Sequence, residues 1–67
     1  MNIDIRAHIK ANFKDTSKDE IKSSIVSSIE ANEEITLPGL GVFFEILWTN
    51  SDENGREYIL ESLKKGL

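Results

Sequence analysis

With 67 residues, the chain is long enough for a single small domain over residues 1–67 and too short for a large core. It contains no cysteine, which excludes disulfides, thiolate metal sites and thiol catalysis. Twelve acidic against eight basic residues give a net charge of -4, a balance that disfavours binding to DNA or to an anionic membrane. We find neither a signal peptide nor an apolar run of about 20 residues, so we expect a soluble intracellular protein.

The first element is predicted to be an amphipathic helix over residues 2–13. Ile5, Ile9 and Phe13 recur at steps of four, which places them on one face of a helix. Asn2 is a candidate N-cap, because its side chain can accept a hydrogen bond from the first turn.

A second helix is predicted to begin after Ser17. Ser17 and Glu20 have the spacing of a capping box, in which each side chain bonds the backbone of the other residue. Asn32 tolerates the left-handed conformation that closes a helix, so we expect the helix to end near this residue. Its apolar stripe contains Ile21, Ile25, Val26 and Ile29.

The central apolar segment, residues 42–48, can be interpreted in two ways. As a strand, it would place Phe43 and Leu47 on the same side as Glu45, which breaks the alternation of a half-buried strand. As a helix beginning at Pro38, a favoured first position, it leaves Glu45 outside one broad apolar stripe. No second strand is evident to pair with it, and an unpaired strand is unstable. We therefore favour a helix.

A last helix is predicted over residues 56–65, capped by Asn50 or Ser51. The fold class is then all-α, a compact single domain of about four short helices. The alternative is an α+β fold with a helical hairpin like that of HU proteins and a strand at residues 42–48. In the all-α fold we expect a core of Ile9, Phe13, Ile25, Ile29, Leu40, Phe43, Phe44, Leu47, Trp48, Ile59 and Leu63.

The polar residues do not form a pattern typical of an active site. His8, the single histidine, lies one turn after Asp4, so we expect a surface ion pair between them. Glu45 would have a raised pKa if buried, but an exposed position on the helix is the simpler interpretation. The glycines flanking Leu40 lack the third glycine of a dinucleotide fingerprint and the lysine of a P-loop. We predict no catalytic, cofactor-binding or metal-binding residue and no cofactor.

A contact surface is predicted from the central segment. A small domain cannot hide all of its apolar side chains in one core, so we expect an interaction surface formed by Val42, Ile46 and Trp48. The simplest partner is a second copy, giving a homodimer through a two-fold interface. A monomer with scattered exposed apolar groups is the alternative.

Two family resemblances bear on function. Residues 17–45, a helix pair followed by Ile-Thr-Leu-Pro-Gly-Leu-Gly-Val-Phe-Phe-Glu, resemble the bacterial HU/IHF proteins, which implies a diverged nucleic-acid-binding module as the alternative function. The basic β-arms and the positive charge of that family are missing here, so direct DNA binding is not expected.

Nearly the whole chain resembles the small acid-soluble spore protein I family of spore-forming Firmicutes. The resemblance is carried by Leu37-Pro38-Gly39-Leu40-Gly41-Val42-Phe43-Phe44-Glu45, followed by Ile46, Leu47 and Trp48. It implies synthesis during sporulation, residence in the spore core, no enzymatic activity, and a role in packing or in binding another spore protein.

Overall fold

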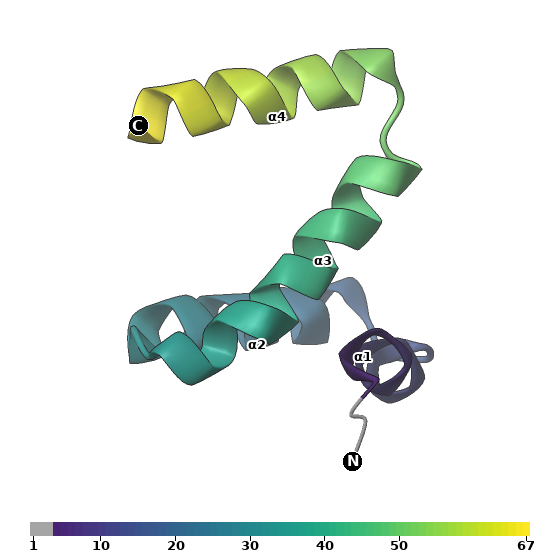
Figure 1. The fold of residues 1–67 in the computed structure, drawn as a ribbon. Coiled ribbons are helices and arrows are strands. Elements are labelled where there is room, and N and C mark those ends of the chain that lie inside the picture. Colours follow the sequence, from purple (N-terminus) through teal and green to yellow (C-terminus); the bar gives the residue numbers. More distant parts are fainter. Residues whose placement is uncertain (1–3) are drawn as a thin grey trace.

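The structure of the protein, a computed structural model, describes residues 4–67. The chain forms α1 (Ile5–Phe13), α2 (Lys18–Ala31), the short 3₁₀ helix η1 (Glu34–Thr36), α3 (Leu37–Asn50) and α4 (Glu53–Gly66). The predicted all-α class and the four helices are confirmed, and no strand occurs among the described residues (Figure 1). The alternative strand at residues 42–48 is wrong, because this segment lies inside α3.

Local capping chemistry sets the start and end of α2. Ser17 Oγ accepts a hydrogen bond from the Glu20 backbone N–H at 3.2 Å, as predicted. The other half of the predicted capping box, a bond from the Glu20 side chain back to the Ser17 backbone, is not present between these two described residues. The helix ends at Asn32, whose left-handed conformation (φ 51°) is also as predicted.

The caps of α1 and α4 differ from the prediction. The Asp4 carboxylate caps α1 by accepting from the Ala7 backbone N–H at 3.0 Å, whereas Asn2 lies outside the described residues. In α4, Asp52 is the cap and accepts from the Gly55 N–H at 2.8 Å. The helix therefore begins three residues earlier than expected.

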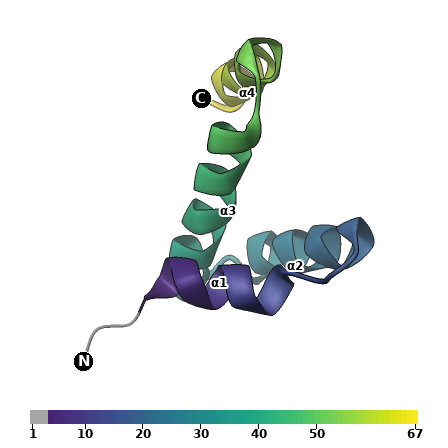
Figure 2. The same ribbon diagram turned by 90° about the vertical axis from the view of Figure 1, so that its right-hand side faces the viewer.

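The helices are arranged along α3. In Figures 1 and 2, α1 and α2 lie at its N-terminal end and α4 lies at its C-terminal end. α1 packs directly on α3, where the rings of Phe13 and Phe43 meet edge to face with centroids 5.1 Å apart. α2 joins α3 through η1, in which Thr36 Oγ1 donates to the Ser28 carbonyl at 3.3 Å.

The packing is more open than the sequence suggested. The radius of gyration is 13.0 Å, against about 11 Å for a compact domain of this length. Val42 is the one buried side chain among the described residues, with 8% of its surface exposed. Several residues predicted for the core are half-buried, namely Ile9, Phe13, Ile25, Leu40, Phe43, Trp48 and Ile59.

Four residues predicted for the core are instead exposed: Ile29, Phe44, Leu47 and Leu63. The physical reason is the arrangement of the helices. α1 covers one side of α3, whereas α4 stands at the far end and leaves the other side open.

Candidate interaction surface

The apolar side of α3 that faces away from Val42 is the most prominent surface feature. α3 is apolar around most of its circumference, so whichever side its neighbours do not cover must expose apolar groups. Phe44 and Leu47, three residues apart and thus on one face, keep 42% and 49% of their surfaces exposed. We call Phe44 and Leu47 the α3 patch.

On one side of the α3 patch, an apolar groove of about 580 Å³ runs between α1, α2 and α3. The α3 patch forms part of its wall, and Lys10 and Lys14 of α1 are its charged lining residues. The apolar lining comes from Ile9, Phe13, Ile21, Ile25, Leu40, Phe43 and Ile46.

A second apolar groove, of about 530 Å³, lies between α3 and α4. It contains the α3 patch as well, so the two grooves are continuous across Phe44 and Leu47. The α4 side of this groove is formed by Tyr58, Ile59, Ser62, Leu63, Gly66 and Leu67. The result is one apolar surface that extends from α1 to the end of the chain.

The junction between α3 and α4 is held by Trp48 and Arg56. The Arg56 guanidinium lies 5.1 Å from the centre of the Trp48 ring, and its Nε donates to the Trp48 carbonyl at 2.9 Å. The Trp48 ring also stacks with Phe44, at a centroid distance of 6.4 Å. These contacts fix the direction in which α4 leaves α3.

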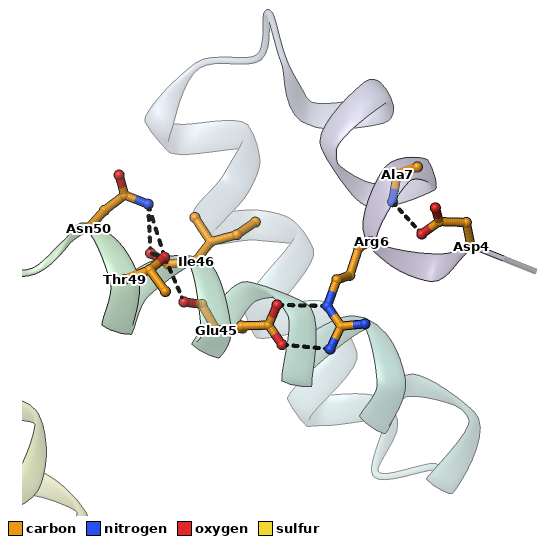
Figure 3. A network of polar contacts seen from close by, with 7 residues as sticks. All are labelled: Asp4, Arg6, Ala7, Glu45, Ile46, Thr49 and Asn50. Carbon is orange, nitrogen blue, oxygen red and sulfur yellow. Dashed lines mark hydrogen bonds and ion pairs between the residues drawn. The ribbon is translucent and has the colours of Figure 1, made fainter.

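On the side of α3 nearer α1, Glu45 is paired with Arg6 (Figure 3). Two parallel hydrogen bonds join the guanidinium to the carboxylate, at 2.7 and 2.9 Å. The hydrogen bond from Arg6 holds the pKa of the Glu45 carboxyl below its ordinary value, and the same bond raises the pKa of Arg6. Glu45 is thus an exposed glutamate, as the simpler interpretation expected, and it fastens α1 to α3.

The C-terminal turn of α3 is closed by side chains, as Figure 3 shows. Thr49 Oγ1 donates to the Glu45 carbonyl at 3.0 Å, and Asn50 Nδ2 donates to the Ile46 carbonyl at 2.9 Å. Ser51 Oγ donates to the Leu47 carbonyl at 2.6 Å. The Ser51 bond satisfies the Leu47 carbonyl, which is one of the last four carbonyls of α3 and has no partner within the helix. The Thr49 and Asn50 bonds are second bonds to carbonyls that the helix already uses.

The predicted ion pair between His8 and Asp4 is wrong. Asp4 is occupied with the cap of α1, and His8 Nε2 lies 3.0 Å from Asn12 Nδ2. Across residues 4–67, no group of three or more histidine, aspartate and glutamate side chains is placed to hold a metal ion. Nor does this part of the chain contain a helix with the length and apolar character needed to cross a bilayer.

The three residues predicted for the interaction surface have different positions in the structure. Val42 is buried on the side of α3 where it lies beside Ile5 and Arg6 of α1, so the expectation that it lies on the surface is wrong. Ile46 is half-buried and lines the first groove, and Trp48 is half-buried beneath Arg56. The residues that sequence reasoning assigned to the core instead, Phe44 and Leu47, form the centre of the exposed surface. Their spacing of three could have identified the pair, but not which side of α3 stays open.

Comparison with known proteins gives one consistent family. A family model described as "Small, acid-soluble spore protein I" matches residues 3–67. The chain is 55% identical over 38 residues to a protein of that name from Bacillus cytotoxicus, covering 57% of this chain and 54% of the relative. It is 53% identical over 38 residues to the proteins of that name from Bacillus cereus strain AH187 and Bacillus anthracis strain CDC 684, covering 57% of this chain and 55% of each relative. The matched segment thus spans about half the length of these curated relatives. No solved structure matches the chain.

Proposed function

The chain belongs to the small, acid-soluble spore protein I family, and on this premise we propose that it is a non-enzymatic protein of the spore core that acts by binding another protein. The family supports the setting, since its name describes a spore protein. The binding role is proposed from the geometry of the apolar surface.

The observation that carries the proposal is the exposed α3 patch with an apolar groove on each side. Contiguous apolar surface of this kind on a small protein is typical of a contact site for a partner. Helical grooves lined by aliphatic and aromatic side chains commonly bind an amphipathic helix of another chain. The surface also takes up much of α3, the helix on which the other elements are arranged.

The non-enzymatic part of the proposal is supported by the polar groups near this surface. Glu45 is tied to Arg6, and Asp4 is tied to the backbone of α1. A general acid or base needs a titratable group within hydrogen-bonding reach of a bound substrate. Among residues 4–67, the charged residues that line the two grooves are Lys10 and Lys14, both in the first groove, and neither groove is lined by a carboxylate or a histidine. The grooves thus lack the side chains that most often act as general acid or base.

The alternative of a diverged HU-like nucleic-acid-binding module loses its structural basis, because residues 42–48 are helical. With a net charge of -4, the protein has few cations with which to displace the counterions of DNA. We expect no gel shift of duplex DNA at moderate salt. A shift at sub-micromolar protein would restore this alternative.

Purified spores provide the test of the proposed function. We expect the protein in the interior fraction of spores, and we expect deletion of its gene to change a measurable spore property such as outgrowth. Leu47→Lys, at the α3 patch, should reproduce the deletion. Ile35→Lys is the matched control, because Ile35 is 82% exposed and lines neither apolar groove.

An immunoblot of each strain checks that the two variants accumulate to the same level. Protein found mainly in vegetative cells would contradict the setting. Spores in which Leu47→Lys behaves like the wild type would contradict the role of the α3 patch.

A further inference from the structure

We propose that the partner of the α3 patch is a second copy of this chain, bound through a two-fold interface centred on Phe44 and Leu47. This inference rests on the proposed function, because it names the partner of the same surface. Three observations support it. They are the excess of exposed surface, the position of the α3 patch between the first groove and the apolar stripe of α4, and the small amount of burial within one chain.

The exposed surface is larger than one compact chain should have. A compact monomer of 7.6 kDa exposes about 4,300 Å², whereas this chain exposes 5971 Å². The excess is on the order of 1,000 Å² or more.

The excess matches the area that a stable dimer needs. If each chain buries roughly 1,000 Å² against its copy, the interface totals about 2,000 Å², the range in which obligate homodimers begin. A short peptide or a small molecule in one of the grooves would cover only part of this surface.

The α3 patch lies between two apolar features that a two-fold axis could bring together across an interface. The groove between α1, α2 and α3 lies on one side of it, and the apolar stripe of α4, with Ile59 and Leu63, lies on the other. α4 stands at the opposite end of α3 from α1 and α2 in both views (Figures 1 and 2). A two-fold axis that passes through the α3 patch and is perpendicular to α3 would place the groove of each copy against α4 of the other, in the reciprocal manner of an isologous interface.

Burial within one chain is also small. Among the described residues Val42 alone is buried, although ordering each residue of a folded chain has a substantial entropic cost. Covering Phe44, Leu47, Leu63 and the walls of both grooves would supply the apolar burial that one chain lacks. On this account the fold and the dimer stabilise each other, so the helix content should depend on protein concentration.

Sedimentation equilibrium on the full chain tests the inference. We expect the wild type to have twice its monomer mass of 7.6 kDa at micromolar concentrations and above. Leu47→Lys would bury a charge at the centre of the interface and should raise the dissociation constant about thirty-fold or more. Ile35→Lys, which makes the same kind of change outside the interface, should leave the dissociation constant unchanged.

A second measurement does not depend on any variant. Isotope-filtered nuclear Overhauser spectra of an equal mixture of labelled and unlabelled wild type should show contacts between chains from the Phe44 ring and the Leu47 methyl groups. A wild type that stays monomeric well into the hundreds of micromolar would overturn the inference. Contacts between chains only at residues outside the α3 patch and the two grooves would overturn it as well.

The outcomes also separate this inference from the proposed function. A monomeric wild type, with Leu47→Lys spores that resemble the deletion, would mean that the α3 patch binds a different protein; the second copy would then be wrong and the proposed function would stand. A wild-type dimer that Leu47→Lys disrupts, with unchanged spores, would support the second copy and remove the proposed role in the spore.

Discussion

Replacing Val42 by alanine tests the central structural finding, which is that this side chain is buried against α1 rather than exposed. The substitution removes the equivalent of two methylene groups, which at about 0.8 kcal/mol each is about 1.6 kcal/mol for a fully buried site. Since Val42 is 8% exposed, nearly all of this applies, and the remaining cavity adds to it. The better helix propensity of alanine returns about 0.5 kcal/mol. We therefore expect a net loss of about 1–2 kcal/mol in the free energy of unfolding.

Val26→Ala in α2 is the matched control, because it makes the same chemical change in the interior of another helix. Val26 is 40% exposed, so the burial term is smaller, while the gain in helix propensity is the same. We expect a loss of only about 0.5 kcal/mol for this variant.

Urea unfolding followed by circular dichroism, at one fixed protein concentration, measures both variants. The fixed concentration matters because the stability of a self-associating protein depends on it. A Val42→Ala loss no larger than that of Val26→Ala would refute the packing of α1 on α3 described here.

Two further predictions concern α3. Gly41→Ala should raise the free energy of unfolding by about 1 kcal/mol, because glycine is a poor helix former and a Cβ at this position meets no heavy atom within 4 Å. Gly66→Ala is equally unobstructed but lies at the last residue of α4, so it should change the free energy of unfolding little. A destabilised Gly41→Ala would contradict the open space beside Gly41. Carbon-13 NMR titration should give the Glu45 carboxyl a midpoint below its ordinary 4.5, and Arg6→Gln should move this midpoint back up, so an unchanged midpoint would contradict the pairing. Because the pKa of Glu45 is lowered in the folded state, the pair stabilises the fold above pH 4.5, and this contribution is lost as the pH falls through the lowered pKa.

The local features of the fold could be predicted from the sequence. Ser17, Asn32 and Pro38 set the bounds of their helices through hydrogen bonds and backbone preferences that involve only residues a few positions away. The helical state of residues 42–48 could also be predicted, since the position of Glu45 fits a helical period and a strand would have had no partner. The family, too, could be recognised from the central segment.

Only the tertiary structure decided which side of α3 is covered. A helix that is apolar on nearly every side gives no periodic signal to distinguish Val42, which is buried, from Phe44 and Leu47, which are exposed. That choice depends on where α1 packs and on where Trp48 and Arg56 direct α4. The packing of α1 on α3 joins segments that are distant in the sequence, and the contact of Trp48 with Arg56 depends on the path of the chain between α3 and α4. The periodicity of a single helix therefore cannot predict either contact.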